Sequence, residues 1–573
     1  MKLANPLERA VDPDRKTVAL VAFPDSLPQP LDLRLFEWLS SVFPVQFVTK
    51  SADDAGAVDG VVYFGQRPRD NSGPTLPSLT YLGNSDKEPA AIGTVVFGDD
   101  MATPQVLRRR SVAQQFCYRP KPLTLNGSHV VLASYGGQPL WATTRGASAR
   151  ADVTTAQLPI IDYYPSFFEY FNRDNFINLL PLVDFVRRLT GEDQWTQPPL
   201  RACFMFDDPN LHSTGYGFID FPTLARHAEQ CRYHVSFATI PLDGWFYSRR
   251  TAQLFREQKS RLSLLVHGND HVQLELGAFG SNQDAIDSLA QALRRVERIE
   301  KRTEVEISRV MAAPFGACTE ETMSVMARLG FEAACISPGS LRYHNSGCPW
   351  SNSLGLRTSE VIAGLPVLPR FTLSGRSKNS ALLAAYLGQP IVPMAHHQDV
   401  ANGLDQLADV AQFINSLGEV RWSDMTSIAR SNILLRQEKD LLRVRPYSRK
   451  FRVMVPAGTT SVSVELPAGA FLNETVQIAV ASGSKAIYSG PAGMPLAVAA
   501  STVLDVALQT PGALDPHSVP DRGLNFWAFA RRQMTEGRDR LQPLFRRLGF
   551  FPANRRRSQS GSKRPEMTKT QTA

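Results

Sequence analysis

Four short apolar runs in the middle of the sequence end directly in polar residues that can carry chemistry. Residues 202–206 end in Asp207-Asp208, residues 262–266 in His267, residues 310–313 in Pro314-Phe315-Gly316, and residues 391–395 in His396-His397. Runs of this length and composition predict strands that are buried on both faces. Because the carboxyl ends of parallel strands meet at one end of a β/α barrel or sheet, we expect the four polar clusters to converge on one site.

Helical segments lie between these runs, as a parallel arrangement of the strands requires. They are predicted at residues 221–231, 284–301, 319–329 and 400–417, and a glycine follows each of the last two. Glycine just past a helix is a usual stop, because it readily adopts the left-handed backbone conformation that closes the last turn. The sequence therefore predicts an α/β fold with a distorted β/α barrel over residues 151–445.

A chain of 573 residues is longer than one domain, so further units flank the predicted barrel. Residues 1–150 contain valine-rich runs and a helical stretch, which predict a small doubly wound α/β domain. No glycine-rich dinucleotide fingerprint follows its first run, so we assign this domain a structural or docking role. After residue 446 the apolar pattern changes to period two, which predicts a β-sandwich-like domain over residues 446–520.

The basic charge of the chain is concentrated after residue 520. The formal net charge is +8, yet residues 521–573 alone contain 13 Lys or Arg against 4 Asp or Glu, so the rest is close to neutral. We predict an amphipathic basic helix over residues 521–552, interrupted at Pro543, that packs against the body and leaves a solvated basic face. A disordered basic tail is predicted over residues 553–573. Weak contact of this region with a membrane or an acidic partner is the alternative, and no nucleic-acid partner is expected.

Cysteine usage and apolar run length bear on the compartment. Six scattered cysteines without a C-x-x-C pair are typical of a reducing environment. No stretch approaches the roughly 18 apolar residues of a transmembrane helix, and the first apolar run is too short for a signal-peptide core. These features favour a cytoplasmic location.

His267 and His271 are four residues apart, a spacing that places two imidazoles on one side of a turn. The pair Asp207-Asp208 can supply an oxygen ligand beside them. Two histidines and one carboxylate around an open position form the pattern of a catalytic zinc or similar ion. We therefore predict a divalent metal site, with zinc as the expected ion.

The order of these clusters resembles that of the NodB-like polysaccharide deacetylases, carbohydrate esterase family 4. That family opens with T-F-D-D-G-P, continues with H-[ST]-x-x-[HN] and P-Y-G, and later has L-x-H. This chain has M-F-D-D-P-N from Met205, H-G-N-D-H from His267, A-P-F-G from Ala313 and M-A-H from Met394. The resemblance covers about a third of the chain and implies a bacterial-type enzyme of carbohydrate metabolism.

The resemblance implies a role for each matching residue. Asp207 would be the general base, while Asp208, His267 and His271 would hold the metal. At the next strand end, the backbone N–H of Phe315 would donate to the oxyanion, and Pro314 and Gly316 would shape the substrate loop. At the last strand end, His396 would protonate the leaving amine, with His397 as the adjacent alternative. Met394 would line the acetyl pocket.

Two positions depart from the family pattern. Pro209 stands where the family has glycine, and Ala312 stands where the family has an arginine that pairs with the base. A carboxylate without its cation keeps a higher pKa, so either another cation substitutes or the chemistry is changed.

Three residues outside the motifs have competing interpretations. His212 is a weaker candidate for the metal site, and a loop or capping role is favoured. Trp245 could stack on a sugar ring or belong to the rim of the fold. Glu275 is expected to be a solvated helix residue rather than a support for a ligand imidazole.

The leading hypothesis is a metal-dependent hydrolase that removes acetyl groups from N-acetylated sugars of a polysaccharide or oligosaccharide. The alternative is a catalytically degenerate carbohydrate-binding or scaffold protein of a polysaccharide pathway, which Pro209 and Ala312 favour. Both hypotheses share a carbohydrate partner.

Overall fold

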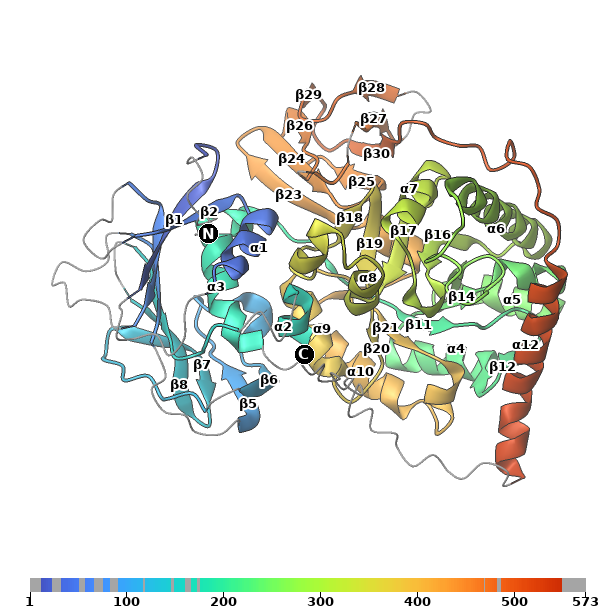
Figure 1. Ribbon diagram of the computed structural model, residues 1–573, viewed down its shortest axis with the longest axis horizontal. Helices are drawn as coiled ribbons and strands as arrows, with labels where there is room; N and C mark the ends of the chain where they lie inside the picture. The colour runs from blue at the N-terminus through green and yellow to red at the C-terminus, as the bar shows by residue number, and fades with distance from the viewer. Residues whose placement is uncertain are drawn as a thin grey trace, which may run out of the picture.

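The computed structural model describes most of the chain. The described residues are 12–22, 32–50, 57–65, 76–82, 91–116, 119–145, 149–159, 166–172, 176–467, 469–471, 473–481 and 486–548. The basic tail predicted at residues 553–573 lies outside them. Figure 1 places an N-terminal sheet, a central barrel and two small C-terminal sheets side by side, with one long helix on the outer edge of the barrel.

The N-terminal sheet has nine strands and mixed direction. Its order is β2 (Val45–Thr49), β1 (Lys16–Ala22), β3 (Gly60–Phe64), β4 (Ser78–Tyr81), β9 (Ala151–Thr154), β8 (Gln138–Thr144), β7 (His129–Tyr135), β5 (Ala91–Phe97) and β6 (Ser111–Phe116). The strands from β2 to β9 are parallel, as a doubly wound sheet requires, but those from β9 to β6 are antiparallel. The parallel pairing expected of this domain is therefore found in half of the sheet, and β9 extends the sheet past residue 150.

Three helices accompany this sheet. They are α1 (Arg34–Val42), α2 (Phe167–Asn172) and α3 (Phe176–Leu189). The buried core that α1 and α3 share with the sheet continues into the core of the barrel, so the two units are packed together.

The barrel consists of parallel strands that alternate with helices. The strands are β11 (Phe204–Asp207), β14 (Val235–Thr239), β15 (Leu262–Val266), β16 (Ile307–Ala312), β17 (Ala333–Ile336), β19 (Leu365–Pro369), β20 (Phe371–Thr372) and β21 (Pro393–Ala395), with β18 (Glu360–Ile362) antiparallel to β19. The helices are α4 (Phe221–Cys231), α5 (Arg249–Glu257), α6 (Asn282–Thr303), α7 (Glu320–Arg328), α8 (Pro338–His344), α9 (Ser377–Tyr386), α10 (Asp405–Asn415) and α11 (Met425–Arg430). The four polar clusters of the sequence follow β11, β15, β16 and β21.

A single residue closes the barrel. β19 pairs with β17 at one end of the sheet, and β20 pairs with β21 at the other end. Because only Arg370 separates β19 from β20, the two ends of the sheet meet in one continuous segment. The opposite mouth is covered by α11, whose Met425 and Ile428 join the interior side chains. The polar strand ends therefore face the open mouth.

The two C-terminal sheets form a sandwich. Their strand orders are β23 (Ile433–Glu438), β24 (Leu441–Pro446), β26 (Ser461–Val464) and β29 (Leu496–Ala497), and β25 (Lys450–Met454), β30 (Val503–Gln509), β27 (Thr475–Val480) and β28 (Ala486–Gly490). One cluster of buried residues draws on both sheets, as a β-sandwich requires. The sandwich begins with β23, before the boundary expected at residue 446.

Helix α12 (Phe526–Arg547) runs along the barrel on the side of α5, in red at the edge of Figure 1. It continues through Pro543, so the predicted interruption is wrong. Its buried positions include Arg532, Glu536 and Asp539, which means that a charged face contacts the body. The prediction that the helix packs against the body is confirmed, and Arg538 and Arg547 are exposed, but the face that packs is charged rather than apolar. Within the described residues, no helix combines the length and apolarity needed to span a bilayer.

Candidate metal centre

Asp208, His267 and His271 come together at the mouth of the barrel. Oδ1 of Asp208 lies 3.3 Å from Nε2 of His271 and 3.8 Å from Nε2 of His267. Their ligand atoms all lie within 4.8 Å of one another. Two ligands about 2.0–2.1 Å from one tetrahedral ion are separated by roughly 3.4 Å, so this group is close to the size that a bound divalent ion needs.

The protonation states of the group suit metal binding. Nδ1 of His267 lies 2.8 Å from the carbonyl oxygen of Ala312, which makes Nδ1 the donor and leaves the lone pair on Nε2 for the ion. Burial and the neighbouring His267 lower the pKa of His271 to about 3, although Asp208 raises it, so the imidazole is neutral. Oδ1 of Asp208 is buried and makes no hydrogen bond within the described residues. An orphaned carboxylate oxygen beside the neutral imidazole of His271 and the free Nε2 of His267 fits a cation.

Two of these residues have left-handed backbone conformations. The φ angle is 85° at Asp208 and 54° at His271. Such conformations are unusual outside glycine, and they aim the side chains away from the course that a regular strand end would give them. The loop after β15 also contains Gly268 at φ 66°, where a Cβ atom would lie 2.4 Å from a carboxylate oxygen of Glu275. A side chain at Gly268 would therefore displace the support of the loop.

Glu275 is that support. It is buried, and its carboxylate accepts hydrogen bonds from the backbone N–H groups of Asn269 at 3.1 Å, Asp270 at 2.8 Å and His271 at 3.0 Å. The expectation of a solvated helix residue is therefore wrong. Burial raises the pKa of Glu275 to about 7, against the three N–H groups that lower it. Glu275 fixes the backbone of His271, a candidate metal ligand.

Asp207 is paired with a cation, Arg370, although Ala312 stands where the family pattern has the pairing arginine. Nη1 of Arg370 donates a hydrogen bond to Oδ1 of Asp207 at 3.0 Å, and both side chains are buried. Burial alone would raise the pKa of Asp207, but the charge of Arg370, with smaller contributions from His267 and His396, holds the pKa below its usual value. Asp207 is thus ionised at neutral pH.

The Pro-Phe-Gly segment forms a short 3-10 turn after β16. Pro314 and Gly316 are buried, whereas the Phe315 ring is 59% exposed and lies 5.5 Å from the His271 ring, centroid to centroid. Phe315 has φ 56° and Gly316 has φ 69°, so both are left-handed. This conformation brings an exposed aromatic ring over one ligand of the metal centre.

The two histidines after β21 point to different places. His396 is exposed, and its charge is among those that lower the pKa of Asp207. His397 is buried against the rings of Tyr216 and Phe218, with Nε2 3.9 Å from Oδ1 of Asp539 on α12. His396 therefore lies close enough to Asp207 to act on its carboxylate, whereas His397 contacts aromatic rings and α12.

Met394, His212 and Trp245 occupy the walls and rim. Met394 is half-buried on β21 and pairs in register with Met205 of β11, so it lies in the strand beside Asp207. Nδ1 of His212 lies 2.8 Å from Glu536 of α12, and its Nε2 lies 2.8 Å from the carbonyl oxygen of Asp243, so both ring nitrogens are engaged away from the metal centre. Trp245 is about half exposed at the rim.

Helix α12 contacts the backbone of the metal centre. Arg532 is buried, binds Asp243 at 2.7–3.1 Å and donates from Nη2 to the carbonyl oxygen of Asp208 at 2.9 Å. Arg531 donates to the carbonyl oxygen of His271. Two arginines from a distant part of the chain therefore support both left-handed ligands.

Sequence reasoning missed Arg370, Asp243 and Arg532. Arg370 follows an apolar run, residues 365–369, and a charged residue directly after a strand was the available signal. Nothing local in the sequence identifies Arg532 among the other arginines of its segment.

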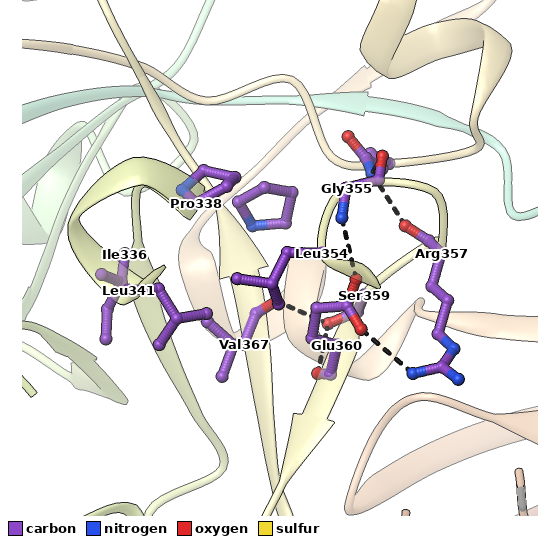
Figure 2. Close-up of a pocket in the computed structure, with 11 residues that line it drawn as sticks. Ile336, Pro338, Leu341, Leu354, Gly355, Arg357, Ser359, Glu360 and Val367 are labelled. Atoms are coloured by element: carbon purple, nitrogen blue, oxygen red, sulfur yellow. Dashed lines mark hydrogen bonds and ion pairs between the residues drawn. The ribbon is translucent and has the colours of Figure 1, made fainter. Parts of the chain in front are cut away.

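A separate pocket lies beside the closing strand. Figure 2 shows its lining, with apolar side chains on one side and the Arg357–Glu360 ion pair at 3.3 Å on the other. It is lined by Ile336, Pro338, Leu341, Leu354, Gly355, Arg357, Ser359, Glu360, Val367, Pro369 and Gln389. None of the metal-centre residues lines this pocket.

Comparisons with known proteins give structural matches to part of the chain. No protein family model and no curated protein matches the chain. A protein assigned as a polysaccharide deacetylase from Mycobacterium smegmatis aligns with 41% of this chain and 91% of its own, at 14% identity and a TM-score of 0.31. A family 4 carbohydrate esterase from Streptomyces lividans, solved with acetate, covers 40% and 94%, at 16% identity and 0.25. A family 4 esterase from Streptococcus mutans covers 40% and 88%, at 13% identity and 0.23. The chain thus resembles family 4 carbohydrate esterases over about 40% of its length, at low sequence identity.

Proposed function

We propose that this protein is a metal-dependent hydrolase that removes acetyl groups from N-acetylated sugars of a polysaccharide or oligosaccharide. One observation carries the proposal: an ionised, buried carboxylate, Asp207, is held by Arg370 directly beside the Asp208, His267 and His271 group. A structural metal site does not require a second carboxylate that stays off the metal, whereas a hydrolytic site requires one as the general base.

The residues at the centre fit a divalent metal. Asp208, His267 and His271 would hold it through one oxygen and two nitrogens, a donor set that suits zinc. When bound, the ion polarises an acyl carbonyl and makes water acidic enough to attack near neutral pH.

Asp207 would act as the general base. Its base form is fully populated at neutral pH because Arg370 lowers the pKa of the carboxyl. The carboxylate takes a proton from the attacking water, and Arg370 keeps one of its oxygens fixed at 3.0 Å while it does so. Arg370 is a positioning residue and does not itself contact the substrate.

The other strand ends complete the reaction. The backbone N–H of Phe315 would donate to the oxyanion of the tetrahedral intermediate. His396, exposed at the mouth, would give a proton to the sugar nitrogen as the C–N bond breaks, which releases acetate and a free amine. The exposed rings of Phe315 and Trp245 offer faces on which sugar rings can stack.

Metal content and acetate release test the proposal together. The purified protein should contain a stoichiometric divalent metal and release acetate from N-acetylglucosamine oligomers. Asp208→Ala and His267→Ala should lose metal and activity, whereas Asp207→Asn should keep the metal and lose at least about a hundredfold in kcat, the range for removal of a general base. Glu257→Gln, on the exposed face of α5, is the matched control.

Two results would contradict the proposal. If Asp208→Ala and His267→Ala both retained the full metal content, Asp208 and His267 would not be metal ligands. Saturable glycan binding without acetate release under any divalent metal would leave the carbohydrate-binding or scaffold alternative.

A further inference from the structure

The outward face of α12 is apolar. Trp527, Met534 and Leu541 are spaced seven residues apart, so they share one face of the helix, and Phe526 and Leu544 lie next to them. Trp527 is 72% exposed and Met534 is 64% exposed. Apolar side chains normally face the body of a protein, so this helix is turned the opposite way from an ordinary surface helix.

Polar contacts fix the helix in this orientation. Arg532 is held by Asp243, Glu536 by His212, and Arg546 by the carbonyl oxygen of Ala401 at 2.8 Å. Rotation of the helix to bury the apolar side chains would carry Arg532 and Glu536 into solvent and leave the buried Asp243 and His212 without these partners, which is unfavourable. The apolar side chains of α12 therefore remain exposed to solvent in the folded protein.

Basic residues lie along the helix beside this face. A groove between α12 and the hairpin of β12 (Gly215–Tyr216) and β13 (Ile219–Asp220) is lined by Arg540, Arg546 and Arg547 together with Asp220, and Arg540 and Arg546 also bind the body. The exposed positions of α12 include Arg538 and Arg547 and no acidic residue. Residues 549–573 add six Lys or Arg and a single Glu.

We propose that α12 docks this protein onto a membrane surface rich in anionic phospholipids. An amphipathic helix with aromatic and aliphatic side chains toward the bilayer enters the boundary between head groups and acyl chains, and flanking arginines bind the anionic head groups. A second copy of the chain fits less well, because pairing two such faces would bring basic residues together without acidic partners. The proposal is independent of the hydrolase activity.

Vesicle co-sedimentation tests the proposal on the full chain. Phosphatidylcholine vesicles that contain phosphatidylglycerol should bind the protein, vesicles of phosphatidylcholine alone should bind it far less, and added salt should weaken the binding. The variant Trp527→Gln/Met534→Gln/Leu541→Gln should bind at least about tenfold more weakly, because three large apolar groups no longer enter the bilayer.

Matched variants separate this surface from general effects. Met454→Gln/Ile487→Gln/Met494→Gln changes three exposed apolar residues of the sandwich and should leave binding unchanged. An unchanged thermal transition shows that the α12 variant is folded.

Three results would overturn the proposal. They are failure of the wild type to bind the anionic vesicles, equal binding of the α12 variant, and a dimer in sedimentation equilibrium that the α12 variant converts to a monomer. The last result would make a second copy of the chain the occupant of this face.

Discussion

Arg370 donates a hydrogen bond to Asp207 at 3.0 Å. Arg370 is the single residue between β19 and β20, where the barrel closes. The motif resemblance placed the partner of the base two residues before Pro314, where this chain has Ala312. Both Ala312 and Met205 line the barrel interior, and Nη1 of Arg370 lies 3.3 Å from the sulfur of Met205. The cation therefore comes from the junction of β19 and β20 rather than from β16, and Asp207 keeps a charge partner.

A double-mutant cycle should detect this pair. Arg370→Met and Asp207→Asn should each lower the free energy of unfolding by about 3–5 kcal/mol, because each leaves an unpaired buried group. The double variant should cost clearly less than the two losses together, as measured by urea unfolding. Strictly additive losses would mean that the two side chains do not interact.

Removal of Glu275 should weaken metal binding without removing a ligand. Glu275→Ala leaves three backbone N–H groups of the ligand loop without their acceptor, so His271 loses its fixed position. We expect about a 10- to 100-fold loss of zinc affinity, the range for groups that orient a ligand, in competition titrations with a chelator. The control Glu257→Gln should not change the zinc affinity. An unchanged zinc affinity in Glu275→Ala would show that the loop keeps its conformation without Glu275.

The sequence predicts the barrel and the metal group because both depend on local patterns. An apolar run that ends in a polar residue specifies a strand end, and parallel strands bring such ends together. Arg370 reaches the site only because β19 and β20 join the two ends of the sheet, a relationship that no local pattern contains. The orientation of α12 was misjudged for a related reason: its periodicity predicts apolar burial, but the pairing of Arg532 with Asp243 decides which face turns inward.

Arg532 should couple the position of α12 to the metal centre. Arg532→Met leaves the buried carboxylate of Asp243 without its cation and removes the donor to the carbonyl oxygen of Asp208. Amide hydrogen exchange over residues 526–547 should accelerate, and zinc affinity should fall by about tenfold, at the lower end of the range for supporting groups. Arg538→Met, at a side chain that is 68% exposed, is the control. Slow exchange in Arg532→Met would contradict this role.

The contact between His212 and Glu536 should make the stability of the α12 interface depend on pH. Burial lowers the pKa of His212, but its bonds to Glu536 and to the Asp243 carbonyl raise it above the usual 6.5. Burial likewise raises the pKa of Glu536, but His212 and Arg540 lower it from 4.5 to about 2. The contribution of His212 is complete below its unfolded pKa and is lost as pH rises through the raised folded value. The contribution of Glu536 is complete above 4.5 and is lost as pH falls towards about 2.

Both contributions are therefore present between about pH 4.5 and 6.5, and the variant Glu536→Gln tests this window. Glu536→Gln should cost about 1.5–3 kcal/mol there, the range for hydrogen bonds to a charged group. Thermal unfolding at a series of pH values should show the difference from wild type shrinking as pH falls from 4.5 towards about 2, because Glu536 of the unfolded wild type takes up a proton while the folded carboxylate stays ionised until about pH 2. Above the pKa of His212 the difference should shrink only in part, since Arg540 still donates to Glu536 at 2.7 Å. A difference that is constant across this pH range would show that the two side chains contribute through packing rather than through charge.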